Sequence, residues 1–177
     1  MHTVHLFNPA AGAGRRFAEI RAQAEKTGEK IYVTENSGHA MRLCASLCRD
    51  DPHVHITVYG GDGTVHEAVN GIVASGHGDT ASFTVVPSGS GNDFAHDVGY
   101  QKGDKPFEVA PYLKNLPFVE VNGLKRRFIN GIGYGIDGYC CEVGDELRKR
   151  SDKPVNYGAI AVKGLFFYYH PTNATVT

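Results

Sequence analysis

The sequence predicts an α/β fold in which a parallel sheet carries helices on both faces and is followed by the start of a β-rich, β-sandwich second domain. Three observations indicate this. Short apolar runs alternate four times with segments of helical periodicity. Glycine-rich stretches follow three of the four runs. After about Leu116 the helical periodicity fades, and glycine and aromatic residues become more frequent. Right-handed crossovers between parallel strands account for the first part.

Four apolar runs are predicted to be the strands of the sheet. The first, residues 4–7, ends at Asn8-Pro9, which favours a turn. The next two are residues 31–34 and 55–59, and the fourth, 83–86, is stopped by Pro87. Ligands of such sheets bind beyond the carboxyl ends of the strands. The segments that follow these runs are therefore the candidate functional segments.

Three helices are expected between the strands, over residues 14–26, 38–49 and 64–74. Gly28 can end the first of them, and Thr64 can cap the third. Apolar side chains recur at helical spacing in all three. The predicted inner faces are Phe17, Ile20 and Ala24 in the first helix; Ala40, Leu43, Cys44, Leu47 and Cys48 in the second; and Val65, Ala68, Val69 and Ile72 in the third.

The later part of the chain reads as a second domain. Residues 118–129 form a predicted hairpin around Asn122-Gly123. Helices are expected at 142–150 and 156–169, followed by a β-rich end at 175–177. These features divide the chain into domains 1–116 and 117–177. About sixty residues are few for a separate core, so the second domain is expected to be incomplete or to use a partner, with a homodimer left open.

Composition excludes several classes of protein. Eighteen basic residues face nineteen acidic ones among 177, which argues against a nucleic-acid binder that works by bulk charge. No apolar stretch reaches about 18 residues and the N-terminus lacks a signal-peptide pattern, so any membrane contact is expected to be peripheral. The four cysteines lack zinc or C-x-x-C spacing and fit a reducing cytoplasm. Likewise, the histidines at 39, 55, 66 and 96 are not spaced as metal ligands.

The strongest motif is Gly60-Gly61-Asp62-Gly63-Thr64, between the third strand and the third helix. Its glycines allow a close backbone approach, and the amides at the helix start form an anion site. A carboxylate beside phosphates normally holds a cation or accepts a proton. This turn therefore indicates a magnesium-bound nucleotide. The alternative is a tight turn in which Asp62 is only a turn former.

Two weaker motifs follow the first and fourth strands. Asn8-Pro9-Ala10-Ala11-Gly12-Ala13-Gly14 is neither a dinucleotide fingerprint, since position 17 is Phe, nor a Walker loop. Arg15 or Arg16 could contact phosphate or be solvated. In Pro87-Ser88-Gly89-Ser90-Gly91-Asn92-Asp93-Phe94-Ala95, Asp93 supplies a second carboxylate. The alternative for Asp93 is a cap of the next helix.

The three motifs together resemble the diacylglycerol kinase catalytic domain family, which includes sphingosine, ceramide and bacterial lipid kinases. The resemblance rests on NPAAGAG, GGDGTVHEAVNGI and PSGSGNDFA, over residues 3 to about 98. It implies an ATP- and Mg²⁺-dependent lipid kinase of phospholipid metabolism, acting on diacylglycerol or a similar lipid. The enzyme would be cytoplasmic and would meet its lipid substrate peripherally at the inner membrane surface.

The resemblance also implies roles for individual residues. Asp62 would be catalytic and, with Asp93, would hold the metal. The nucleotide site would be formed by Asn8, Gly12, Gly14, Thr34, Gly60, Gly61, Asp62, Gly63, Thr64, Glu67, Gly89, Ser90, Asn92 and Asp93. Glu67 would support the phosphate loop, and Ser90 stands where the family often has Thr. The general base of bacterial members lies in a later part of the second domain, to which nothing in this chain can be matched.

Other functions stay open at this stage. An NAD kinase shares the GGDGT motif, but its usual Asn-Glu pair is not found here. A non-catalytic nucleotide or lipid sensor is compatible with the short chain, and a Rossmann oxidoreductase is a third alternative. The basic clusters 125–127 and 148–150 are expected to be solvated, with attraction to anionic lipids as the alternative. The aromatic run 166–169 is expected in the core, with an interface as the alternative.

Overall fold

The structure is a computed structural model that describes residues 2–11, 17–101, 105–151, 155–171 and 173. It contains two compact units, Met1–Asn130 and Gly131–Thr177. Each unit is described separately below. The boundary predicted near residue 116 stays a prediction about domain organisation.

The first unit is built on a sheet with strand order β2-β1-β3-β4-β5. The first four strands in the chain are parallel, and the short β5 runs antiparallel to β4 at the edge. All four predicted strands are confirmed, and their carboxyl ends therefore lie along one edge of the sheet. Their bounds are β1 (Thr3–Phe7), β2 (Lys30–Val33), β3 (His55–Gly60), β4 (Ser82–Pro87) and β5 (Phe107–Glu108).

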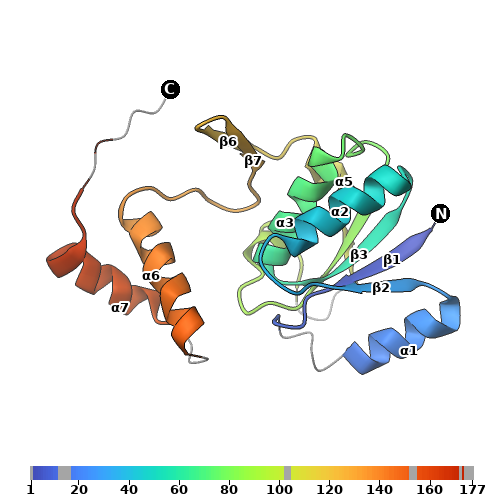
Figure 1. Ribbon diagram of the computed structural model, residues 1–177, viewed down its shortest axis with the longest axis horizontal. Helices are drawn as coiled ribbons and strands as arrows, with labels where there is room; N and C mark the ends of the chain where they lie inside the picture. Colours follow the sequence, from blue (N-terminus) through green and yellow to red (C-terminus); the bar gives the residue numbers. More distant parts are fainter. Residues whose placement is uncertain (1, 12–16, 102–104, 152–154, 172, 174–177) are drawn as a thin grey trace. The chain divides into compact units, whose positions relative to one another are not determined.

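Helices cover both faces of this sheet, as the sequence predicts. On one face, α1 (Phe17–Thr27) buries Ile20 beside Phe7 of β1. On the other, α2 (His39–Asp50) and α3 (Asp62–Ala74) lie side by side and enclose the main core (Figure 1). The buried inner residues of these two helices are Ala40, Cys44, Cys48, Val65, Ala68, Val69 and Ile72. The parallel α/β fold class is thus confirmed.

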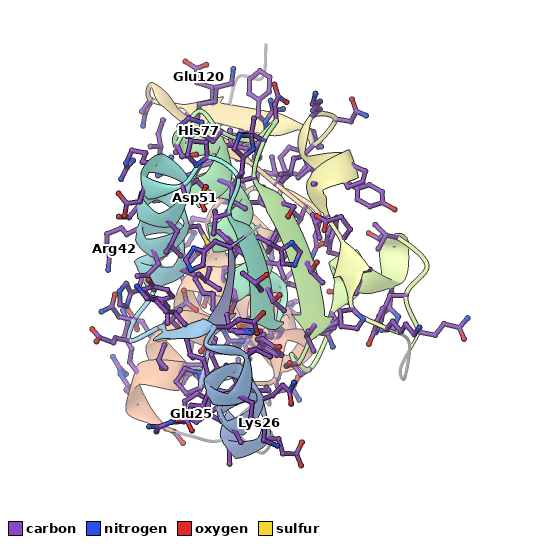
Figure 2. All side chains as sticks on the ribbon, turned by 90° about the vertical axis from the view of Figure 1, so that its right-hand side faces the viewer. Glu25, Lys26, Arg42, Asp51, His77 and Glu120 are labelled. Atoms are coloured by element: carbon purple, nitrogen blue, oxygen red, sulfur yellow. The ribbon has the colours of Figure 1, made fainter. Side chains whose placement is uncertain are left out.

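Charged side chains of the helices turn away from this core. In Figure 2, Glu25 and Lys26 near the end of α1 and Arg42 of α2 point outward from the ribbon. The chain leaves α1 at Gly28, whose φ of 72° is a left-handed conformation that glycine adopts without strain. This residue ends the helix as expected.

The structure corrects the predicted start and cap of the third helix. Helix α3 begins at Asp62 rather than Thr64, and its N-cap is the extended residue Gly61. Thr64 therefore lies inside the first turn and does not cap the helix. Its hydroxyl accepts a hydrogen bond from the Asn8 side chain instead. The glycine before Asp62 allows the helix to start directly at the end of β3.

A two-stranded antiparallel sheet closes the first unit, and it corresponds to the predicted hairpin. Strands β6 (Phe118–Val121) and β7 (Leu124–Arg127) are joined by Asn122 and Gly123, both with positive φ. The Asn70 side chain of α3 bonds to the backbone N–H and C=O of Arg127, at 2.8 and 2.9 Å. The buried Asn70 thus anchors the hairpin to α3. Two short helices precede it, α4 (Asp93–Asp97) and α5 (Ala110–Leu113).

The described part of the second unit is helical. Helix α6 (Ile136–Arg150) begins six residues before the predicted 142. The predicted helix 156–169 divides into α7 (Tyr157–Lys163) and the π-helical segment η2 (Gly164–Tyr168). The expectation that the aromatic run lies in a core is wrong for Phe166, Phe167 and Tyr168, whose side chains are exposed. The predicted β-rich end at 175–177 lies outside the described residues.

Candidate functional site

A pocket of about 450 Å³ lies where the carboxyl ends of β1, β2 and β3 meet the N-terminus of α3. The sequence places small and polar residues after each of these strands, so backbone and polar atoms reach the pocket surface. Such an edge is where open α/β sheets bind ligands. The pocket is lined by Asn8, Pro9, Ala10, Ala11, Thr34, Glu35, Asn36, Ser37, Ala40, Gly61, Gly63, Thr64 and Glu67.

The N-terminus of α3 supplies the pocket with an anion-binding end. The helix has 13 residues and starts immediately after Gly61. The first amides of a helix have no acceptor within it, and the helix dipole adds positive potential there. The wall at Gly63 is open, because a Cβ built at this position meets no atom within 4 Å. A phosphate group can therefore approach the backbone closely at this point.

Asn8 connects the loop after β1 to this helix end. Its side-chain amide donates to Thr64 Oγ1 at 2.8 Å, and its Oδ1 accepts from the backbone N–H of Ala10 at 3.0 Å. Its own N–H donates to the carbonyl oxygen of Tyr59 on β3 at 3.0 Å. With both ends of its side chain engaged, Asn8 fixes the pocket floor rather than pointing freely into it.

Glu67 connects α3 to the start of α2. Its Oε1 accepts from the backbone N–H of Gly38 at 2.7 Å and from Ser37 Oγ at 3.4 Å. Its Oε2 accepts from the N–H of Ala40 at 3.1 Å. The carboxylate therefore holds the N-terminus of α2 and, with it, the pocket wall that follows β2.

The loop after β4 lies against the glycine turn after β3. A Cβ built on Gly61 would lie 2.8 Å from the Cα of Gly89, and one built on Gly89 would lie 2.6 Å from the Cα of Gly61. Only glycine at both positions permits this approach. Asn92 folds its loop by accepting from Gly89 N–H and donating to Gly89 C=O, both at 2.9 Å. It does so with a left-handed backbone, φ 60°.

Two carboxylates meet beside this contact. Asp62 Oδ1 accepts from the backbone N–H of Phe94 at 3.0 Å, which joins α3 to α4. A Cβ built on Gly91 would lie 3.4 Å from Asp62 Oδ2 and 3.4 Å from each carboxylate oxygen of Asp93. Both acids therefore face the same space. Such a pair fits Mg²⁺, which usually takes one or two protein carboxylates and completes its shell with water and phosphate oxygens.

Within the described residues, no group of three or more His, Cys, Asp or Glu side chains is arranged to hold a metal ion. A metal held by Asp62 and Asp93 would need further ligands from a bound phosphate or water. Their assignment as metal ligands stays a prediction.

The structure brings most of the predicted site residues together. Asn8, Thr34, Gly61, Gly63, Thr64 and Glu67 line the large pocket. Gly60, Asp62 and Asn92 line a small neighbouring cavity that shares Gly61. Gly89 packs on Gly61, Asp93 lies beside Asp62, and Ser90 is exposed in the same loop. Gly12 and Gly14 lie outside the described residues, and the binding role of the whole set stays a prediction.

Sequence reasoning missed the pocket wall formed by Glu35, Asn36 and Ser37. These residues follow β2 and Thr34 in the chain, and they line the pocket. Their position after a predicted parallel strand, combined with three consecutive polar side chains, could have identified them. No feature of the sequence pattern predicts the hydrogen bond that Ser37 Oγ donates to Glu67.

Comparison with known proteins gives the chain its family. The sequence model described as "Diacylglycerol kinase catalytic domain" matches residues 2–116, more than half of the chain. The chain belongs to this family. The matched residues contain the pocket, the glycine turn with Asp62 and the loop with Asp93. The resemblance seen in the sequence motifs is thereby confirmed.

Individual members of the family match over shorter or longer ranges. The chain is 30% identical over 154 residues to "Putative lipid kinase YtlR" of Bacillus subtilis, covering 78% of this chain and 49% of that protein. It is 34% identical over 94 residues to a diacylglycerol kinase of Staphylococcus carnosus, covering 50% of this chain and 30% of the relative. It is 31% identical over 112 residues to human sphingosine kinase 1, covering 55% and 28%.

A solved structure of the family shares the fold. The protein described as "A putative diacylglycerol kinase from Bacillus anthracis str. Sterne" superimposes with a TM-score of 0.50 at 23% identity. The match covers 70% of this chain and 46% of that one. The chain thus spans about half the length, or less, of the relatives it matches. None of the helices in the described part of the chain is long and apolar enough to cross a lipid bilayer.

Proposed function

We propose that the protein is the nucleotide-binding part of an ATP-dependent lipid kinase, which transfers the γ-phosphate of ATP to the hydroxyl of diacylglycerol or a similar lipid. The observation that carries the proposal is the position of Asp62. It is the first residue of α3, in a turn of three glycines, and it faces the same space as Asp93. Membership of a lipid kinase family supports the same reaction class.

Each part of the site has a task in this reaction. The amides at the start of α3 would bind and orient the phosphates, because they combine hydrogen-bond donors with the positive end of the helix. Asn8 and Glu67 would keep the two neighbouring walls in place through the bonds described above. Positioning and charge neutralisation supply most of the rate in phosphoryl transfer, so a rigid cradle is the appropriate device.

Asp62 and Asp93 would hold Mg²⁺ in this proposal. When bound, the metal neutralises the charge that develops on the transferred phosphate. Asp62 also keeps α4 in place, since its Oδ1 accepts from Phe94 N–H. One carboxylate oxygen would thus be structural, and the other, on the side of Asp93, would serve the metal. The lipid acceptor would be met peripherally at the cytoplasmic surface of a membrane.

The test combines Mg·ATP titration calorimetry with a labelled-ATP transfer assay on detergent-dispersed diacylglycerol. The variant Asp62→Asn keeps an oxygen that can accept from Phe94 N–H, so the fold should survive. It loses the negative charge, and we expect transfer to fall at least ~100-fold. The matched control is Asp97→Asn, an exposed acid at the end of α4, which should transfer normally. Full activity of Asp62→Asn would remove Asp62 from its role.

The same assay separates the alternative functions. Heat of Mg·ATP binding without transfer to any lipid would favour a nucleotide sensor. Transfer of phosphate to NAD but not to diacylglycerol would favour an NAD kinase. Absence of any Mg·ATP binding would overturn the proposal as a whole.

A further inference from the structure

Helix α3 carries polar residues on a side that does not line the large pocket. Asp62, His66 and Asn70 follow one another at intervals of four residues, so they lie along one side of the helix. Thr64 and Glu67 line the pocket and bond to the loop after β1 and to the start of α2. The side that carries His66 therefore extends from the carboxylate of Asp62 toward the β6–β7 hairpin, outside the proposed nucleotide pocket.

Asn70 closes the far end of this polar side. Its Oδ1 accepts from the backbone N–H of Arg127 on β7 at 2.8 Å, and this bond fixes the orientation of the amide. The donor end, Nδ2, donates to the carbonyl oxygens of Arg127 and His66, both at 2.9 Å, and lies 3.4 Å from His66 Nε2. Asn70 is thus engaged at both ends, and it sets the environment of the His66 ring.

His66 presents a single hydrogen-bond donor. A proton on Nε2 would point at the amide hydrogens of Asn70, so the proton of the neutral ring belongs on Nδ1. Burial lowers the pKa of His66 below its ordinary value near 6.5, which keeps the ring neutral at pH 7. The side chain is only partly buried, and none of the residues that the structure describes accepts a hydrogen bond from Nδ1.

This donor lies one helical turn from the proposed reacting groups. Four residues of α-helix correspond to a rise of about 6 Å, which separates His66 from Asp62. In the proposed reaction the transferred phosphate and the attacking hydroxyl meet beside Asp62. A donor one turn further along the helix therefore reaches a group next to that hydroxyl rather than the hydroxyl itself. In a diacylglycerol this neighbouring group is an ester carbonyl, which accepts hydrogen bonds and donates none.

We propose that His66 determines specificity for the lipid acceptor, by donating a hydrogen bond from Nδ1 to an ester carbonyl oxygen beside the hydroxyl that receives the phosphate. The inference rests on the proposed lipid kinase function and adds the class of acceptor, which is a lipid with an ester carbonyl next to its free hydroxyl. The bond orients the acceptor, and such positioning supplies much of the rate in phosphoryl transfer. A lipid without this carbonyl would leave the His66 donor unpaired.

The first experiment compares two amides at position 66. The amide nitrogen of asparagine can occupy the place of imidazole Nδ1, whereas that of glutamine occupies the place of Nε2. On detergent-dispersed diacylglycerol, His66→Gln should lower kcat/KM for the lipid about 5- to 10-fold, and His66→Asn should stay close to the parent chain. The affinity for Mg·ATP should not change in either variant, because His66 does not line the pocket. The matched control is His53→Gln, an exposed histidine, which should transfer normally.

The second experiment changes the lipid instead of the histidine. A dialkylglycerol keeps the hydroxyl and both chains but has ether oxygens in place of the ester carbonyls. The parent chain should use it about 5- to 10-fold less efficiently than diacylglycerol, since the same hydrogen bond is lost. His66→Gln should then lose nothing further on the ether lipid. This non-additivity is the sign of a direct interaction between the two groups.

Several results would overturn the inference. These are full activity of His66→Gln on diacylglycerol, equal and additive losses on both lipids, and better transfer by His66→Gln than by His66→Asn. A loss of Mg·ATP affinity or of thermal stability in parallel with the loss of transfer would assign His66 a structural role only. Failure of the proposed function looks different, because the parent chain itself would then transfer phosphate to neither lipid, and the inference would fall with it.

Discussion

Glu67 shows how a single residue of α3 shapes a pocket wall that belongs to another helix. Helix α2 begins after Gly38, which has a left-handed backbone at φ 79° and provides no side-chain cap. The carboxylate of Glu67 takes over this task by accepting from Gly38 N–H and Ala40 N–H. A negative group at a helix N-terminus is stabilised by the helix dipole. The loop from Thr34 to Ser37, which lines the pocket, is thereby tied to the glycine turn.

We expect Glu67→Gln to lower the free energy of unfolding by about 1–3 kcal/mol, because the amide has a single acceptor oxygen and leaves either Gly38 N–H or Ala40 N–H without an acceptor. Mg·ATP affinity should also fall, since the pocket wall after β2 loosens. Chemical denaturation and titration calorimetry measure the two effects. The matched control for stability is Glu35→Gln, an exposed acid on the same wall. If both variants unfold like the parent chain, Glu67 does not hold α2.

At the scale of elements, the site depends on two loops that touch through glycines. The turn between β3 and α3 and the loop between β4 and α4 approach until Gly61 and Gly89 leave no room for a Cβ on either. Gly63, only two residues away, has open space instead. Neighbouring glycines of one motif therefore serve different purposes. Gly61 permits contact between loops, and Gly63 leaves the pocket open to a ligand.

This difference can be measured with two alanine substitutions. Gly61→Ala forces the two loops apart and should destabilise the protein by about 1–3 kcal/mol. Gly63→Ala places a methyl group in open space within α3, where alanine is favoured over glycine, and should stabilise the fold by about 0.5–1 kcal/mol. Gly63 also lines the pocket, so an added methyl group should weaken Mg·ATP binding. Thermal unfolding measures the stability of both variants, and titration calorimetry measures their affinity for Mg·ATP. Equal stability of the two would contradict the assignment of roles.

The elements that sequence reasoning predicted are those with long periodic patterns. The inner faces of α2 and α3 were predicted residue by residue, including Cys44 and Val69, because burial on a sheet imposes helical spacing. The site followed from topology, since strands that run in parallel bring Asn8 and Asp62 to one edge. A two-residue strand such as β5 and a five-residue helix such as α4 leave no periodic trace.

Tertiary contacts explain the rest of the differences. The start of α3 at Asp62 and the engagement of Thr64 by Asn8 depend on two loops 56 residues apart. The aromatic run at Phe166 carries the composition of a core, but composition does not state whether a partner surface exists. That depends on the whole unit, in which α6 covers only one side of the segment.

For the whole molecule, two partly buried groups connect folding to pH. Burial lowers the pKa of His66 in α3 below its ordinary value near 6.5. The nearby Glu67 carboxylate raises this pKa and Arg126 lowers it, and the net effect is a lowered pKa. Hydrogen bonds from Thr27 and then His5 lower the pKa of Glu29 below its ordinary value near 4.5. In both cases the unfolded chain binds the proton more readily than the folded one. Stability therefore rises with pH through each range.

Both groups make the free energy of unfolding rise with pH, but they do so over different pH ranges. Above pH 6.5 His66 is neutral in the folded and the unfolded state, so its titration does not change the free energy of unfolding. As pH falls below 6.5 towards the folded pKa, the unfolded chain takes up the proton first and the free energy of unfolding declines. The Glu29 contribution is complete above pH 4.5 and is lost below it.

We therefore expect the free energy of unfolding to decline in two steps on acidification. Urea unfolding between about pH 8 and about pH 3 tests this. His66→Gln should remove the upper step alone, whereas the matched control His53→Gln, an exposed histidine, should leave it in place. An upper step that survives in His66→Gln would show that another group causes it.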